Sequence, residues 1–183
     1  MRNMVVAGGQ LGPISRDETK ASAVNRMIAL MHQAASRGAQ LIVFPELALT
    51  TFFPRWWVEN KTDFDHMFER EMPNEDVLPL FETSKKLNIA FHLGYAELTP
   101  DGHRYNTAIM VNNIGKIIGT YRKIHLPGHS DNQEWRPFQH LEKYYFEKGN
   151  LGFPVFDALD AKIGMCICND RRWPETWRVL GLK

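Results

Sequence analysis

Four residues of this sequence combine reactive side chains with a shared kind of position. Three of them directly follow an apolar run, and the fourth lies in a long loop: Glu46, Lys123, Cys168 and Glu142. Apolar runs of this length predict buried strands, and strand ends are where α/β sheets place their sites. A thiol is mostly protonated at neutral pH, so it needs a base to remove its proton or a cation to stabilise the thiolate. Two carboxylates and one ammonium supply both, and the set predicts nucleophilic catalysis by cysteine.

Each of these residues, taken singly, also has an ordinary structural explanation. A glutamate after a proline is most often solvated, a lysine after Tyr121-Arg122 usually lies on the surface, and a cysteine in an apolar strand is usually an inert core residue. Even a Glu–Lys–Glu cluster is compatible with a purely structural ion pair. In favour of chemistry, an ammonium close to two carboxylates stays charged, and partial burial raises the pKa of a glutamate so that it can accept and return a proton. The catalytic interpretation therefore requires that the four side chains meet in the folded chain.

The residues that follow the reactive cysteine are suited to binding a charged substrate. Arg171 and Arg172 are adjacent guanidinium groups, which bind a carboxylate through paired hydrogen bonds better than lysine does. Asn169 is a candidate polar contact to the substrate. In the competing interpretation one of the arginines, Arg172 in particular, forms an ion pair with a neighbouring acid, Asp170 or Glu175.

The segment 124–150 shows no sustained periodicity but is rich in aromatic residues, which is typical of a loop or short-helix region that carries a site. It also carries three histidines: His125, His129 and His140. A loop histidine is more often a hydrogen-bonding scaffold residue than an acid–base catalyst. We therefore expect these three to hold the residues of the site in place rather than to act on the substrate. The pair Trp56-Trp57 can either wall a pocket or fill the core.

The two cysteines, Cys166 and Cys168, are the only ones in the chain. Residues two apart in a strand point the same way but are poorly placed for a mutual disulfide. The chain has no second cysteine pair and no His-x-x-x-His partner, so the sequence gives little indication of a metal site. We therefore expect reduced thiols, no metal and no organic cofactor, with Cys166 serving only in packing.

Composition narrows the class of protein. The chain has 183 residues, of which 44% are hydrophobic and 23% charged, as expected for one globular domain. Its 22 Lys and Arg residues against 21 Asp and Glu residues give a formal charge of +1, which predicts binding to neither nucleic acid nor an anionic membrane. No apolar run reaches the ~18 residues of a spanning helix, and Val5-Val6-Ala7 is too short for a secretory signal. We expect a cytoplasmic protein.

The periodicity of the apolar residues predicts an α/β protein that begins with a strand-helix-strand unit. A helix is expected after Asp17, capped by Asp17 or Ser15 and ended by Gly38, and two further helices over 77–87 and from Pro174 toward Leu182. Strands are expected at 4–7, 41–44, 89–93, 105–111, 117–121, 154–156 and 163–167. The alternation predicts one more strand beside 163–167, which would otherwise leave an open edge. We therefore expect the chain to be the front part of a longer domain.

Three separate segments carry a resemblance to a known superfamily. They are Phe44-Pro45-Glu46-Leu47, Tyr121-Arg122-Lys123-Ile124-His125-Leu126, and Cys168-Asn169-Asp170-Arg171-Arg172-Trp173-Pro174-Glu175. In this order they resemble the three signatures of the nitrilase, or carbon–nitrogen hydrolase, superfamily. Segments 48–56 and 136–143 are similar to the N-carbamoyl-D-amino acid hydrolases within it. The resemblance implies one carbon–nitrogen hydrolase domain over 1–183, with a nitrilase-like α-β-β-α sandwich fold that is truncated at its C-terminus, because roughly the first three-fifths of that family's length is covered.

The resemblance also implies a role for each reactive residue. Cys168 is expected to attack the ureido carbonyl carbon, and Glu46 to take its proton and pass it to departing ammonia. Lys123 is expected to face the developing oxyanion together with a backbone N–H near Asn169. Glu142 is expected to position Lys123 and the hydrolytic water.

The same resemblance implies the substrate class. Arg171 and Arg172 are expected to bind the α-carboxylate of an N-carbamoyl-D-amino acid, which is cleaved to the D-amino acid, carbon dioxide and ammonia. The partners implied are this small-molecule substrate and, at full length, further copies of the chain in a homo-oligomer. The alternatives are another amidase, a ureidopropionase-like hydrolase or a nitrilase of the same superfamily, and a catalytically silent fragment with only a binding or assembly role.

Overall fold

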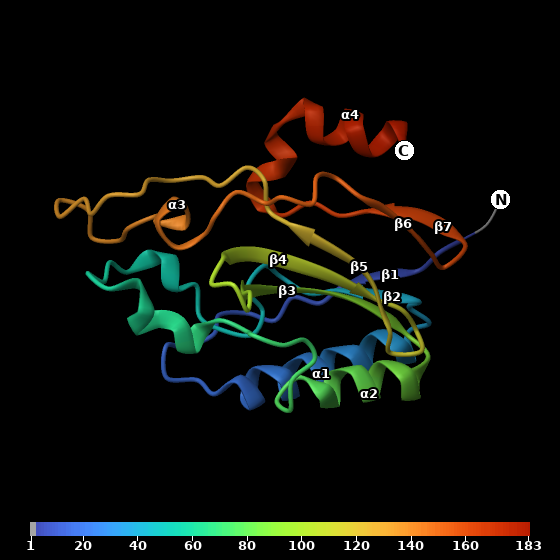
Figure 1. Cartoon of the computed structure of the whole chain (residues 1–183). Coiled ribbons are helices and arrows are strands. Elements are labelled where there is room, and N and C mark those ends of the chain that lie inside the picture. Colours follow the sequence, from blue (N-terminus) through green and yellow to red (C-terminus); the bar gives the residue numbers. More distant parts are fainter. Residues whose placement is uncertain (1–2) are drawn as a thin grey trace.

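The computed structural model describes residues 3–183, which form four layers (Figure 1). Two helices, α1 (Lys20–Ser36) and α2 (Leu78–Leu87), cover one face of a five-stranded sheet. A two-stranded sheet lies on the other face, and α4 (Pro174–Leu182) lies outside it. The α-β-β-α layering of the predicted fold class is confirmed.

The large sheet combines parallel and antiparallel pairing. Its strands, in spatial order, are β1 (Val6–Gly8), β2 (Leu41–Val43), β3 (Ala90–Leu98), β4 (Arg104–Val111) and β5 (Ile117–Arg122). The first three are parallel because α1 and α2 return the chain between them, whereas short turns make β3, β4 and β5 antiparallel. Two reversals leave β5 running in the same direction as β2. Both strands therefore end on the same side of the sheet.

Helix α1 begins at a different cap from the predicted one. Thr19 is the N-cap, and its hydroxyl oxygen accepts a hydrogen bond from the backbone N–H of Ser22 at 3.2 Å. Asp17 and Ser15 were expected there, but both precede the helix, and Asp17 lies in the turn that leads into it. The end of the helix is as predicted, because Gly38 adopts the left-handed φ of +78° just beyond it.

The small sheet is the hairpin β6 (Val155–Ala158) and β7 (Ala161–Gly164). The strand predicted over 163–167 is misplaced, since β7 begins two residues earlier and ends at Gly164. The reason is that Gly164 already pairs with Val155, the first residue of β6, so the ladder has no further partner. Met165 and Ile167 nevertheless stay buried between the two sheets.

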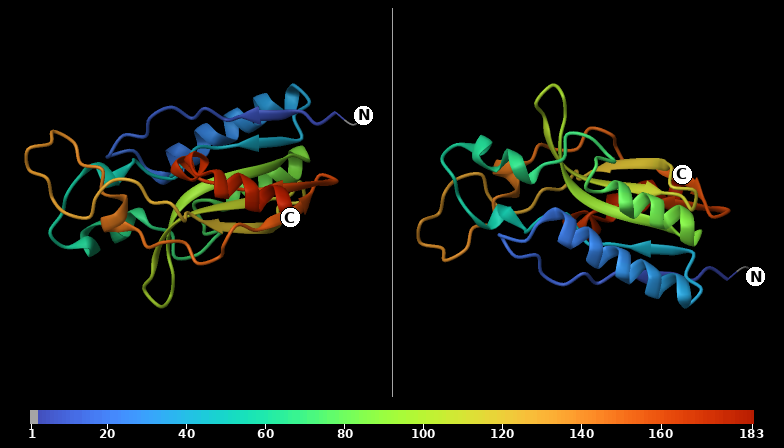
Figure 2. Two further views of the ribbon diagram at one scale, coloured as in Figure 1. Left: turned by 90° about the horizontal axis from the view of Figure 1, so that it is seen from above. Right: turned by 90° about the horizontal axis from the view of Figure 1, so that it is seen from below.

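Two segments that are far apart in the sequence lie side by side at one end of the molecule, away from both labelled termini (Figure 2). These are residues 50–70 and the segment 124–150, which contains the short helix α3 (Glu142–Tyr145). Tyr145 donates its hydroxyl to the carbonyl of Trp56 at 2.7 Å, and Tyr144 donates its hydroxyl to the carbonyl of Val58 at 2.9 Å. A buried cluster of aromatic rings around Phe53 fills the space between the segments. The long loop is therefore held by a small core of its own.

Among the helices of residues 3–183, none has the length and apolar character needed to cross a lipid bilayer.

Candidate active site

Glu46 is positioned by a tight turn after β2. The next residue, Leu47, has a left-handed φ of +53°, and the backbone N–H of Ala48 donates to the carbonyl of Gly94 at 2.9 Å. A Cβ at Gly94 would lie only 2.9 Å from the carbonyl oxygen of Pro45. The absence of a side chain at this point of β3 therefore lets the turn press against the sheet and fixes where Glu46 starts.

Lys123 follows β5 and lies completely buried at the centre of the site. Its ammonium nitrogen lies 2.7 Å from Glu46 Oε1 and 2.5 Å from Glu142 Oε2. Glu142 is itself 1% exposed, and Glu46 is 19% exposed, so one carboxylate is enclosed and the other reaches solvent. The backbone N–H of Lys123 donates to the carbonyl of Asn106 at 2.8 Å, which ties the base of the side chain to β4.

Cys168 comes to the same cluster from the small sheet. It is the first residue of a 3-10 turn (Cys168–Arg172) and has a left-handed φ of +45°, a conformation that is strained for a residue with a side chain. Its thiol lies close enough to the cluster for Glu46 and Lys123 to shift the pKa of the thiol in opposite directions, Glu46 upward and Lys123 downward. The structure thus brings together Glu46, Lys123, Glu142 and Cys168, which come from four separate parts of the chain.

Charges in the cluster act on one another strongly. Burial alone would lower the pKa of Lys123, but the facing carboxylates of Glu46 and Glu142 outweigh it and raise that pKa. Burial, and then the charge of Glu46, raise the pKa of Glu142. Burial of the sulfur and the same Glu46 carboxylate also raise the pKa of the Cys168 thiol. The resting site therefore holds a neutral thiol next to a carboxylate that can accept its proton.

The turn that carries Cys168 is fixed by Asp170, a fully buried acid. Its Oδ2 accepts hydrogen bonds from the Tyr121 hydroxyl at 2.7 Å and from the Ile167 backbone at 3.0 Å. Its Oδ1 accepts the backbone N–H of His125 at 2.9 Å and lies 2.8 Å from His125 Nδ1. Because Tyr121 belongs to β5, Asp170 joins the turn of the small sheet to the large sheet.

Two buried residues of the site were missed by the sequence analysis as contributors. Asp170 was considered only as an ion-pair partner for Arg172. Asn106 was not considered, although its side chain is fully buried and its Nδ2 donates to Glu46 Oε1 at 2.5 Å. Its Oδ1 has no hydrogen-bond partner among residues 3–183. An amide within the predicted strand 105–111, where a buried polar group needs a partner, is the signal that would have found it.

The predicted histidines divide into two kinds. His125 binds Asp170 and stacks on Trp173 with ring centroids 4.8 Å apart, and His140 Nε2 lies 3.4 Å from Glu142 Oε1. His140 therefore touches the cluster itself, whereas His125 contacts the turn that carries Cys168. His129, in contrast, contacts Gln139 Oε1 at 3.1 Å and stabilises only the loop.

The residues predicted to contact the substrate, which follow Cys168 in the sequence, make contacts of their own in the structure. Arg171 Nη1 donates to the Cys168 carbonyl at 2.8 Å and lies 4.0 Å from its sulfur. Asn169 donates its side-chain amide to the carbonyl of His125 at 3.0 Å. Arg171 and Arg172 are exposed, and within residues 3–183 neither forms an ion pair with a carboxylate. The competing pairing of Arg172 with Asp170 or Glu175 is therefore not found, since Asp170 is already saturated by other donors.

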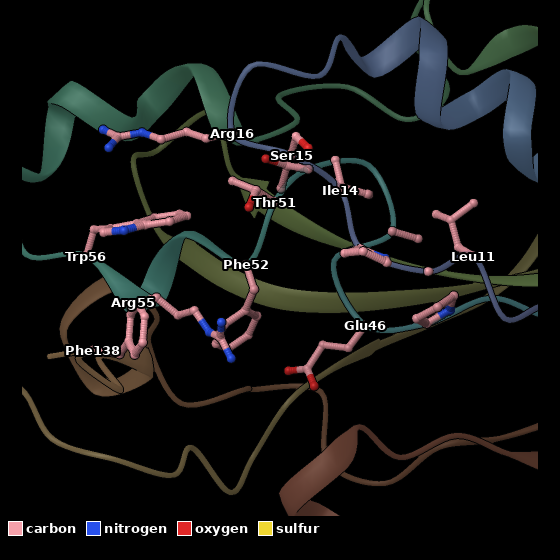
Figure 3. A pocket seen from close by; sticks show the side chains of 15 residues that line it. Leu11, Ile14, Ser15, Arg16, Glu46, Thr51, Phe52, Arg55, Trp56 and Phe138 are labelled. Atoms are coloured by element: carbon pink, nitrogen blue, oxygen red, sulfur yellow. The ribbon is translucent and has the colours of Figure 1, made fainter.

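A cavity of about 520 Å³ opens beside Glu46 (Figure 3). Its walls come from residues 11–16, from 45–56 after β2, and from Phe138 of the long loop. Trp56 lines this cavity, as one of its two predicted placements required, whereas Trp57 packs on Tyr144 with centroids 4.4 Å apart. Across residues 3–183, no group of three or more histidine, cysteine or acidic side chains is arranged to hold a metal ion.

Comparisons with known proteins show the family and the fold of the chain. Residues 5–183 match the protein family described as carbon-nitrogen hydrolase. The whole chain is 34% identical to a citrullinase of Francisella tularensis and 28% identical to an N-carbamoylputrescine amidase of Solanum tuberosum. The fold superposes on the crystal structure of a carbon-nitrogen hydrolase from Helicobacter pylori with a TM-score of 0.78 and 25% identity, over 98% of the chain. The chain spans 59%, 56% and 56% of the lengths of these three proteins, respectively.

Proposed function

The chain belongs to the carbon-nitrogen hydrolase family, and on this premise we propose that Cys168 hydrolyses the carbon–nitrogen bond of N-carbamoyl-D-amino acids. The observation that carries the proposal is the contact of one thiol with the Glu46–Lys123–Glu142 cluster. A purely structural ion pair needs no cysteine beside it. Cys168 is exposed, and Glu46 lines the cavity, so a substrate has access to the thiol and to the carboxylate.

In the first step Cys168 Sγ attacks the ureido carbonyl carbon while Glu46 takes the thiol proton. The raised pKa of Cys168 keeps the proton on sulfur until the substrate is in place, so proton removal and attack belong together. The carbon–nitrogen bond to the terminal NH2 then breaks, and Glu46 returns the proton to that nitrogen, which leaves as ammonia. A carbamoyl thioester on Cys168 remains.

Lys123 stabilises the negative charge that develops on the carbonyl oxygen. An ammonium has three N–H donors, and two of them are used by Glu46 and Glu142. The third is available for the oxyanion, and it is fixed in direction because the other two are held.

In the second step a water molecule attacks the thioester carbon, with Glu46 as the base and Glu142 holding Lys123 in place. The bond to Cys168 Sγ breaks and the thiol recovers its proton. The product is an N-carboxy amino acid, which loses carbon dioxide to give the free amino acid. All atoms of one water and one ureido group are accounted for without a further reagent.

The choice of substrate rests on two separate arguments. The relatives named citrullinase and N-carbamoylputrescine amidase both point to a ureido or carbamoyl group, although neither name indicates a D-amino acid. The exposed guanidiniums of Arg171 and Arg172 at the cysteine favour a substrate with an α-carboxylate. The preference for the D isomer rests on the resemblance of segments 48–56 and 136–143 alone.

The test is ammonia release from N-carbamoyl-D-amino acids, with the L isomers measured in parallel. We expect Cys168→Ala to lose at least about a thousandfold in turnover, as removal of a covalent nucleophile does. Cys166→Ala is the matched control and is expected to retain activity, because no hydrogen bond or ion pair of the cluster involves that thiol. Full activity in Cys168→Ala, or no ammonia from any ureido acid, would contradict the proposal.

A second candidate is hydrolysis of a carbamoyl amine that lacks an α-carboxylate. The relative named N-carbamoylputrescine amidase favours it. Ammonia release from N-carbamoylputrescine that exceeds release from every N-carbamoyl amino acid would favour this candidate over the first.

A further inference from the structure

The cavity beside Glu46 contains positive charges that the proposed reaction does not use. Two arginines line it, Arg16 and Arg55, while Glu46 is its only acidic lining residue. Glu46 already accepts hydrogen bonds from Lys123 and Asn106. The wall of the cavity is therefore positively charged without a counterion of its own.

Arg55 is held so that its guanidinium faces the cavity. Its carbonyl accepts the backbone N–H of Gln139 at 3.0 Å, and its guanidinium carbon lies 5.5 Å from the ring centre of Phe138. Figure 3 shows the side chain extending from its turn toward Phe52 and Glu46. No carboxylate in the described part of the chain forms an ion pair with it. Stacking on a ring leaves the N–H donors at the edge of a guanidinium free for a ligand.

Arg16 adds a second charge at the far wall. Its guanidinium carbon lies 5.1 Å from the ring centre of Trp56 and 5.6 Å from that of Phe64. Within residues 3–183 it too lacks an acidic partner. Two uncompensated guanidiniums around one cavity favour an anionic occupant and oppose a cationic one.

We propose that this cavity receives the side chain of the substrate and selects side chains that end in a carboxylate, with Arg55 as the residue that binds it. The inference rests on the proposed function, because it assumes that the ureido group lies at Cys168 and the α-carboxylate at Arg171 and Arg172. The side chain then leaves past Glu46 into the cavity. A volume of about 520 Å³ is ample for an acidic amino acid side chain.

The inference also predicts which ligands are excluded. A substrate with a terminal ammonium, such as N-carbamoylputrescine, would place its charge against Arg55. The favoured class is therefore the N-carbamoyl derivatives of dicarboxylic amino acids.

The test compares N-carbamoyl-D-glutamate with N-carbamoyl-D-glutamine, which have nearly the same shape and differ in charge. We expect kcat/KM to favour the glutamate derivative by about tenfold or more, as a charge-assisted hydrogen bond predicts. Arg55→Gln is expected to remove this preference, and Arg55→Lys to restore it in part. Arg136→Gln is the matched control, since Arg136 also stacks on an aromatic ring, 4.5 Å from the centre of Trp135, but lies outside the cavity.

Binding to the Cys168→Ala protein separates this inference from the proposed function. Calorimetry with the two derivatives is expected to show tighter binding of the acidic one, and weaker binding of it in Cys168→Ala/Arg55→Gln. Preferential binding of the acid without any hydrolysis by the unmodified protein would overturn the proposed function and leave the inference standing. Equal affinity for the two derivatives, or an unchanged preference in the Arg55 variant that still shows a normal melting temperature, would overturn the inference.

Discussion

The charged groups of this protein fall into two regions that are built in opposite ways. Around Lys123 the charges are buried and partnered, with Lys123 Nζ 2.7 Å from Glu46 and 2.5 Å from Glu142. Around the cavity and the cysteine turn, Arg55 and Arg171 are exposed and have no acidic partner within residues 3–183. In the proposed function the buried region carries out the reaction, and the exposed guanidiniums pair with the substrate.

Removal of the central charge of the buried region is expected to have the largest effect. Lys123→Met leaves Glu46 and Glu142 facing each other without a cation, which we expect to cost about 3–5 kcal/mol of stability. Loss of the oxyanion donor is expected to lower kcat by about 10²–10³. Thermal unfolding and ammonia release measure the two effects, and the exposed Lys143→Met serves as the control.

The double variant Lys123→Met/Glu142→Gln sharpens this result. We expect it to recover stability, because one of the two opposed carboxylates is neutral, but to recover no activity. If Lys123→Met alone were as stable as the unmodified protein, the buried region would not be the tightly coupled cluster described here.

Loss of the Asn106 amide is expected to have the next largest effect. Asn106 and Lys123 bind the same oxygen of Glu46, so together they fix the orientation of this carboxylate. Asn106→Ala is expected to lower kcat by about tenfold to a hundredfold with little change in KM, because a hydrogen bond to a charged group is lost. Thr107→Val on the same strand is the control, since Thr107 donates to Glu97 instead. A change in KM alone would contradict this positioning role.

A substitution in the exposed region is expected to weaken substrate binding. Its effect on activity should be smaller than that of the substitutions in the buried region. Arg172→Gln should raise KM for an N-carbamoyl amino acid by about tenfold or less and leave kcat nearly unchanged, since one exposed charge is lost. Steady-state kinetics measures this split. A loss of kcat with an unchanged KM would show that Arg172 acts in the reaction rather than in substrate binding. The distinction between the two regions would then be wrong.

The pH dependence of thiol alkylation is the mildest test. The pKa of Cys168 is raised by burial and by the Glu46 carboxylate, so the rate of alkylation should rise with pH around a midpoint above that of a free cysteine. Glu46→Gln removes the negative charge and should lower the midpoint. The experiment is done in a Cys166→Ala background so that one thiol reports. A midpoint at or below that of a free cysteine would contradict this prediction, because it would mean that the charge of Lys123, rather than that of Glu46, has the larger effect on the pKa of Cys168.

Local patterns were sufficient to predict most of the helices and strands, because apolar periodicity survives in the packed layers. They failed in two places, for different reasons. The cap of α1 is Thr19 and not Asp17, although its hydrogen bond to Ser22 is local, because several neighbouring residues can serve as caps. The end of β7 at Gly164 is set by its partner strand, which the local sequence does not show.

The same division holds for the site. The reactive types and their positions after apolar runs indicated Glu46, Lys123 and Cys168 as candidates before any geometry was known. Asn106 and Asp170 were missed because their importance comes from what they touch across the sheets, and a single sequence carries no record of such contacts.

The hydrogen bonds of Asp170 have a consequence for heat inactivation. They span the interface between the two sheets, so the distance from sulfur to base depends on how the layers are stacked and not on either sheet alone. A slight sliding of the layers on warming would separate the reacting atoms while every strand stayed intact. Catalysis should accordingly fade at temperatures where circular dichroism still reports a fully folded chain.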